Sequence, residues 1–108
     1  MTIDRLCCFV TAVKHMNFTR AAAELHMAQT AMSRQIAMLE SELDCRLFDR
    51  SNRTIQLTPA GKCFFDGISP LLKNYDKIVK ETQMVGKRLA GELRIGIGQY
   101  EQSFVSEL

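Results

Sequence analysis

The sequence lacks the features that mark membrane and secreted proteins. No apolar run approaches the ~18 residues that a membrane-spanning helix needs, and the first residues lack the basic-then-apolar layout of a signal peptide. Of the 108 residues, 46% are hydrophobic and 24% are charged, which is typical of a globular protein and excludes a disordered or fibrous one. We therefore expect one modest domain with an extension, located in the cytoplasm and not bound to a membrane.

The cysteines form no metal or redox motif. They are Cys7, Cys8, Cys45 and Cys63. None belongs to a Cys-x-x-Cys pair, and neither histidine stands at zinc-finger spacing from them. Small reduced side chains in or near a cytosolic core are the favoured interpretation, with a redox or metal role as the alternative. A nucleophilic Cys/His or Ser/His site would need a third orienting group, which nothing in the sequence suggests, so we expect no enzyme, cofactor or metal site.

An excess of one charge sign is also missing. The net charge is only +2, and the four arginines within residues 28–58 are matched by four acidic residues. Total charge therefore does not predict a nucleic-acid partner, and any such prediction has to come from where the arginines point.

Apolar residues at helical spacing predict two short helices at the start of the chain. Leu6, Phe9, Val10 and Val13 form the apolar stripe of the first. This helix should span about Ile3 to His15, and the second should run from its N-cap at Thr19 to Leu25 or His26. The alanines at 21–23 would let another helix cross closely, as a helix-turn-helix requires.

A third helix, expected over about Gln29 to Leu43, has two distinct faces. Its apolar face comprises Met32, Ile36, Leu39 and Leu43. The opposite face comprises Thr30, Ser33, Arg34 and Ala37. Taken alone, the second face is best interpreted as an ordinary solvated surface. A two-stranded ribbon predicted directly afterwards favours DNA recognition instead.

The predicted ribbon consists of strands at 47–50 and 54–57, joined through the turn-favouring residues 51–53. A helix with a free polar face fits the DNA major groove, and a basic ribbon beside it can reach the backbone or the minor groove. The order of elements thus predicts a mainly α fold in which a helix-turn-helix is followed by a two-stranded ribbon. The helix-turn-helix should cover about 18–37 and the ribbon, called the wing below, about 47–57.

A long helix should follow, with Thr58 as its cap and Pro59 at its first position. Its apolar positions alternate in steps of four and three: Phe64, Ile68, Leu71, Tyr75, Ile78, Thr82, Val85 and Leu89. A helix of this length cannot bury that seam on a domain of about sixty residues, so a second copy of the chain is the simplest partner. The residues predicted to mediate dimerisation are Ile68, Leu71, Tyr75 and Ile78.

The chain is thus expected to contain a DNA-binding domain (1–58), a linker and dimerisation helix (59–89), and the start of a further domain (90–108). Residues 91–98 alternate between apolar and other residues like a strand. A lone strand cannot form a core, so we expect the further domain to continue beyond this segment.

A set of residues in fixed order resembles a known family. The set comprises Phe9, the segment 18–22, Leu25, Gln29, Ser33, residues 35–36, 39–40, Leu43, residues 47–50 and the segment 57–61. Over essentially the whole chain it resembles the N-terminal DNA-binding region of LysR-type transcriptional regulators. The resemblance implies a winged helix-turn-helix, a dimerising linker helix and a C-terminal effector domain shaped like a periplasmic binding protein. Any small-molecule effector would bind only in that last domain.

The resemblance also implies partners and roles. The partner would be double-stranded DNA, bound by a homodimer at an interrupted inverted repeat. The resemblance is also compatible with tetramers in a longer protein. The residues implied to face the major groove are Gln29, Thr30, Ser33 and Arg34. Arg50 would meet phosphate, and Arg53 would enter or flank the minor groove. The chain departs from the family at Ala28, which lacks a capping side chain, at Thr30, and at Asp44, where a left-handed conformation is expected.

A winged-helix module for protein–protein interaction and dimerisation is the alternative function. A protein-binding surface would expose an apolar patch, whereas the open helix face carries Arg34 and the wing tip carries Arg53. These two arginines favour DNA.

Overall fold

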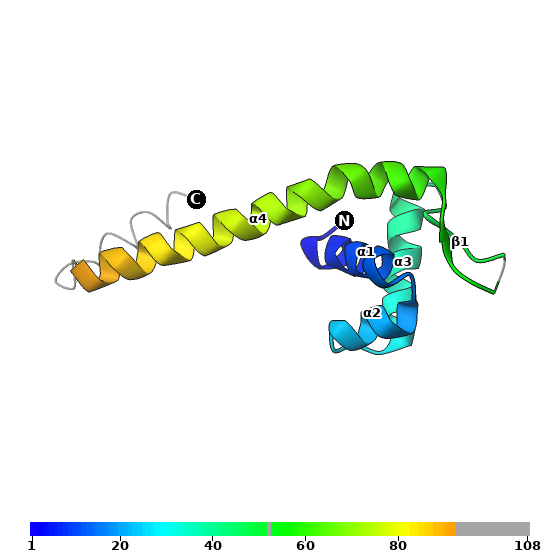
Figure 1. The fold of residues 1–108 in the computed structure, drawn as a ribbon, viewed down its shortest axis with the longest axis horizontal. Coiled ribbons are helices and arrows are strands. Elements are labelled where there is room, and N and C mark those ends of the chain that lie inside the picture. The colour runs from blue at the N-terminus through cyan, green and yellow to red at the C-terminus, as the bar shows by residue number, and fades with distance from the viewer. Residues whose placement is uncertain (52, 93–108) are drawn as a thin grey trace. The chain divides into compact units, whose positions relative to one another are not determined.

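The computed structural model describes residues 1–51 and 53–92, with side chains described up to Arg88. Its elements are α1 (Ile3–His15), α2 (Phe18–Glu24), α3 (Gln29–Leu43), β1 (Phe48–Asp49), β2 (Gln56–Leu57) and α4 (Pro59–Glu92), shown in Figure 1. The chain divides into one compact unit over Met1–Lys73 and a second from Asn74 onward. The mainly α winged helix-turn-helix predicted from the sequence is confirmed, and the predicted bounds of α1 and α3 agree with those observed.

The start of α2 differs from the prediction. Asn17, and not Thr19, caps this helix, and its side-chain oxygen accepts a hydrogen bond from the backbone N–H of Arg20 at 2.9 Å. Met16 ends α1 in a left-handed conformation, so the chain turns and leaves Asn17 extended, as an N-cap requires. The cap lies two residues earlier than predicted, which places Phe18 inside α2, where it is buried.

The core lies where the three short helices meet the wing and the first turns of α4. Its largest fully buried side chains are Phe9, Met32, Ile36, Leu39, Leu47 and Phe48. The Phe9 ring lies 5.6 Å from that of Phe48 and 5.3 Å from that of Phe64, which joins α1 to both the wing and α4. Ala21 and Ala22 are buried, as close helix packing requires, whereas Ala23 is exposed.

The wing's paired strands are shorter than predicted. Among the described residues of the wing, only Phe48–Asp49 and Gln56–Leu57 form the antiparallel ladder, with Phe48 opposite Leu57. After Asp49 the chain turns, because the Asp49 carboxylate accepts hydrogen bonds from both the N–H and the hydroxyl of Ser51. These two bonds lower the pKa of Asp49 from its ordinary value, with the hydroxyl bond as the larger cause. Arg50 therefore leaves the ladder.

Helix α4 begins as predicted. Pro59 is its first residue, and the Thr58 hydroxyl accepts a hydrogen bond from the N–H of Gly61 at 3.0 Å, which confirms Thr58 as the cap. The helix continues through Pro70 and ends at Glu92, three residues beyond the predicted end. Gly91 and Glu92 are therefore helical rather than the start of a strand, and residues 93–98 of the predicted strand lie outside the described residues.

Candidate nucleic-acid interface

Helix α3 presents one buried and one open face, as its sequence pattern predicts. Met32, Ile36 and Leu39 are fully buried. On the opposite side Gln29, Thr30, Arg34 and Ala37 are exposed, and Ser33 is half-buried. The N-cap residue Ala28 makes no side-chain hydrogen bond, so the first-turn amides of α3 have no capping acceptor from it. At the other end Asp44 adopts the expected left-handed conformation, with φ of 54°.

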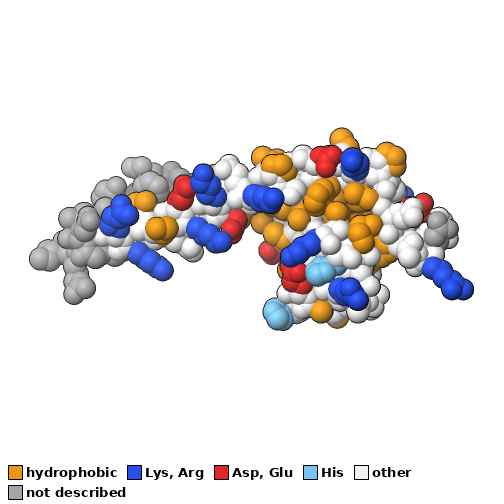
Figure 2. Space-filling model, viewed as in Figure 1, with side chains coloured by type: hydrophobic (Ala, Val, Ile, Leu, Met, Phe, Trp, Pro, Cys, Tyr) orange, Lys and Arg blue, Asp and Glu red, His pale blue; other side chains and the backbone are white. Residues whose placement is uncertain are grey.

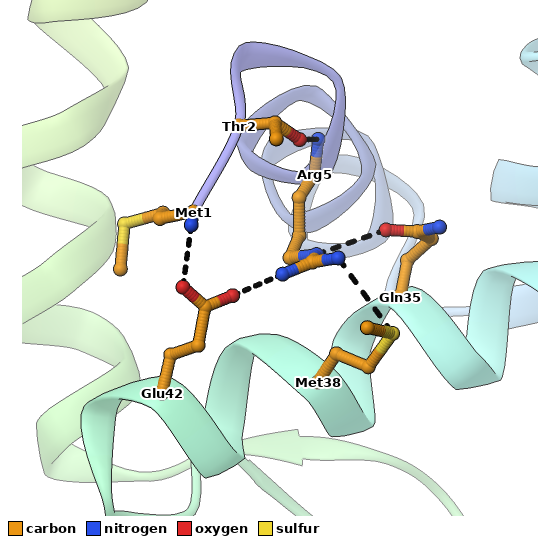
Figure 3. A network of polar contacts seen from close by, with 6 residues as sticks. All are labelled: Met1, Thr2, Arg5, Gln35, Met38 and Glu42. Carbon is orange, nitrogen blue, oxygen red and sulfur yellow. Dashed lines mark hydrogen bonds and ion pairs between the residues drawn. The ribbon is translucent and has the colours of Figure 1, made fainter.

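A polar network ties α3 to α1 (Figure 3). The Arg5 guanidinium donates to Gln35 Oε1 at 3.0 Å and to the Glu42 carboxylate, and it contacts Met38 Sδ. The N-terminal ammonium lies 2.5 Å from Glu42 Oε2. This ammonium, followed by Arg5, holds the pKa of Glu42 below its ordinary value. The network braces α3, so the side chains on its open face are presented from a fixed scaffold.

A smaller cluster joins α1 to α2. His15 Nε2 lies 2.7 Å from Glu24 Oε1, and Lys14 Nζ lies 3.4 Å from the same oxygen. The hydrogen bond with His15 is the main cause that lowers the pKa of Glu24. Polar side chains thus connect α1 to both helices of the helix-turn-helix, α2 and α3.

Arg50, the residue that follows β1, is held by two partners within the protein. Its guanidinium carbon lies 5.1 Å from the centroid of the Phe18 ring, close enough for a cation–π contact. Its Nη2 lies 3.5 Å from Glu40 Oε1, and 36% of the side chain remains exposed. The sequence did not predict these contacts, because the three residues lie on α2, α3 and the wing.

At the wing, the right end of the view in Figure 2, a Lys or Arg side chain extends into solvent. Arg53 is exposed there. A hollow of about 480 Å³ lies next to the ribbon, lined by Arg46, Phe48, Asp49, Arg50, Ser51 and Thr58. Arg46, which sequence reasoning did not single out, is 73% exposed. In the sequence, only its position four residues before Arg50 indicated that Arg46 could belong to the same basic surface.

The residues predicted to mediate dimerisation are not equivalent. Leu71, Tyr75 and Ile78 are 63%, 49% and 52% exposed, respectively, on α4. Ile68 instead is partly buried and packs against the core of the first unit. Further along the helix Val79, Met84 and Val85 are also exposed. Large apolar side chains thus remain uncovered along α4.

The four cysteines lie in different surroundings. Cys8 is buried and Cys7 half-buried, whereas Cys45 and Cys63 are exposed, so the predicted location in or near the core fits only the first two. Burial is the main cause that raises the pKa of the Cys8 thiol. Within the described part of the chain, no three His, Cys, Asp or Glu residues are grouped to hold a metal ion. No described helix is long and apolar enough to cross a membrane.

Comparison with known proteins identifies close likenesses. Residues 3–62 match the model of the family described as "Bacterial regulatory helix-turn-helix protein, lysR family". The probable cat1 operon transcriptional activator of Acinetobacter lwoffii is 40% identical over 88 residues, which cover 82% of this chain and 29% of that protein. The transcriptional regulator BenM of Acinetobacter baylyi is 38% identical over 96 residues, which cover 89% of this chain and 31% of BenM.

Solved structures of DNA complexes resemble this chain. The BenM DNA-binding domain in complex with catB site 1 DNA has a TM-score of 0.75 and 39% identity, covering 79% of this chain and 96% of that one. The CbnR DNA-binding domain in complex with DNA has a TM-score of 0.71 and 29% identity, covering 79% of this chain and 98% of that one. The present chain spans about a third of the length of the curated relatives it matches.

Proposed function

This chain belongs to the lysR family of bacterial regulatory helix-turn-helix proteins, and on that premise we propose that it binds an interrupted inverted repeat in duplex DNA as a homodimer and thereby regulates transcription. The open polar face of α3 carries this proposal. It is free while the opposite face of the helix is fully buried, and the similar BenM and CbnR domains were solved with DNA. We also propose a cytoplasmic location, since the chromosome lies there in bacteria.

The exposed side chains support separate roles. We assign Gln29, Thr30, Ser33 and Arg34 to base edges in the major groove, because they share the free face of α3. Arg50 is assigned to a backbone phosphate, and Arg53, exposed on the wing, to the minor groove. Enzymatic activity forms no part of the proposal.

Exposed apolar residues support the homodimer. Leu71, Tyr75 and Ile78 recur three or four positions apart on one continuous helix, so they share a face. Their exposure of 49% to 63% leaves them free for a second copy of α4. Two-fold symmetry in the protein would then require two half-sites in inverted orientation. We further propose that any small-molecule control acts through a domain following residue 90, and that dimers can assemble into tetramers in a longer protein.

The proposed function can be tested by selecting binding sites from a pool of random duplexes. We expect the selected sites to have dyad symmetry, because two identical recognition helices read them. Fluorescence anisotropy at moderate salt should then show a marked loss of affinity when one half-site is scrambled. Equal affinity for all duplexes at that salt concentration would contradict the proposal.

Replacing Arg34 by alanine tests direct base reading by α3. If the guanidinium is bidentate to a guanine, the variant should lose about 1–3 kcal/mol of binding free energy and relax the preference at one base pair in each half-site. Arg88→Ala is the matched control, since it removes the same charge from an exposed position late in α4. An unchanged base preference in Arg34→Ala would remove this residue from the base-reading set.

A further inference from the structure

Glu40, near the end of α3, is a charged residue with only 6% of its surface exposed. Burying a carboxylate is costly unless it is paired and hydrogen-bonded. Glu40 meets both conditions, and its two oxygens have different partners. The first, Oε2, accepts hydrogen bonds from the backbone N–H groups of Leu47 and Phe48 at 2.8 and 3.2 Å. This oxygen therefore fixes the start of the wing to α3.

The second oxygen of Glu40 faces the arginines beside the wing. Oε1 lies 3.5 Å from Arg50 Nη2 and 3.8 Å from Arg46 Nη1. The two arginines differ in how closely they are held, because Arg46 is 73% exposed and Arg50 is 36% exposed. Arg50 also lies over the Phe18 ring. The Arg50 guanidinium is therefore held between α2 and α3 before any partner binds.

A guanidinium has five N–H donors in a fixed plane. Arg50 pairs with Glu40 through a single nitrogen, at 3.5 Å, so its other N–H donors remain available. Arg50 also lines the hollow beside the ribbon. Ordering a flexible arginine on binding costs conformational entropy. A side chain that is already held in place therefore loses less conformational entropy when it binds an anion. Glu40 also partly neutralises Arg50 and Arg46, which weakens attraction to phosphates in general.

We propose that Glu40 is a positioning residue for DNA binding, which acts through Arg50: it fixes the wing on α3 and orients the Arg50 guanidinium toward one backbone phosphate of the specific site. The proposal rests on the proposed function, because the phosphate belongs to bound DNA. It predicts that the Glu40 charge favours the specific site over other sequences. If Glu40 served only to stabilise the fold, its two hydrogen bonds to the wing backbone would be sufficient and its charge would not affect DNA binding.

Glu40→Gln separates these roles, because the amide oxygen of glutamine can still accept from Leu47 and Phe48 while the charge facing Arg50 is lost. We expect the melting temperature to be retained. Affinity for the selected site should fall by about five-fold, the net worth of one hydrogen bond, while affinity for an unrelated duplex should not fall. Asp66→Asn, which removes one charge at an exposed position on α4, should change both affinities alike.

A double-mutant cycle tests whether Glu40 acts through Arg50. Once Arg50 has been replaced by alanine, Glu40→Gln should cause no further loss of specific affinity. Wild-type binding of both duplexes by Glu40→Gln would overturn the proposal. So would losses that simply add in the Glu40→Gln/Arg50→Ala double variant.

A measurement on the unmodified protein covers the case in which Glu40→Gln does not fold. In ¹⁵N relaxation experiments without DNA, the Arg50 Nε–H group should be nearly as rigid as the backbone, while Arg53, which is exposed, should be flexible. Equal flexibility at the two arginines would overturn the positioning role. If instead the protein bound all duplexes equally, the proposed function would fail, whereas a rigid Arg50 would still be observed.

Discussion

Replacing Ile78 by aspartate is expected to turn the proposed dimer into a monomer and to reduce affinity for a site with two half-sites by about 100-fold or more. Ile78 is 52% exposed and shares a face of α4 with Leu71 and Tyr75. A carboxylate in that apolar face would be removed from water on dimerisation without a partner, which is strongly unfavourable. The first unit lies outside this change, so its fold and its affinity for one half-site should be retained.

Sedimentation and DNA binding measured together test this result. Gln83→Asp is the matched control, because it introduces the same charge at an exposed position about 140° around the helix from Ile78. The control should remain dimeric and bind the full site normally. If Ile78→Asp sedimented as a dimer, the interface would have to lie elsewhere on the chain.

The second large effect is expected for Gly61→Ala. A Cβ atom at Gly61 would lie 2.2 Å from the backbone oxygen of Leu47 and 2.7 Å from Leu57 Cδ1. Alanine is favoured over glycine inside a helix by about 1 kcal/mol. The clash should exceed that gain, since overpacking costs about 1–3 kcal/mol or more and a backbone carbonyl cannot rotate away. We therefore expect a clear net loss of stability, with the first turn of α4 pushed off the wing.

Thermal unfolding of three glycine variants tests the close approach at Gly61. A cost of 1 kcal/mol lowers the melting temperature of a small domain by about 4–8 °C, so the loss in Gly61→Ala should be easily measured. At Gly67 and Gly86, which also lie in α4, an added Cβ would meet no described atom within 4 Å apart from its chain neighbours and the helix's own backbone. Alanine at these two positions should be neutral or stabilising. Equal melting temperatures for Gly61→Ala and Gly67→Ala would show that α4 does not approach the Leu47 carbonyl so closely.

Local signals were sufficient to predict most helix bounds. The apolar spacing from Leu6 to Val13 is a property of a few consecutive turns, and so is the two-faced pattern of α3, so both can be recognised without knowing what packs against them. The Thr58–Pro59 start of α4 is equally local, because a cap acts on the N–H groups that directly follow it. Exposure of Arg34 and Arg53 follows from the same patterns, while their contacts with DNA remain predictions.

Predictions that depended on the chain's path between helices were less accurate. The choice between Asn17 and Thr19 as cap of α2 depended on the left-handed turn at Met16 and on burial of Phe18. Both residues have side chains suited to capping, so sequence alone did not distinguish them. The end of α4 was also misplaced, because Ala90 and Glu92 are good helix formers and the helix runs on beyond the predicted end at Leu89.

By itself, the sequence determined the family, the helix-turn-helix, the wing and the exposed face of α3, because each is encoded in the spacing and order of nearby residues. Only the tertiary structure revealed the contacts that hold this face and the wing in place. Arg5 and Glu42 are 37 positions apart, and Glu40 meets Arg50 only because the wing folds back on α3. The close approach at Gly61 likewise depends on the Leu47 carbonyl. Such contacts join residues that no local pattern relates, so they exist only once the chain has packed.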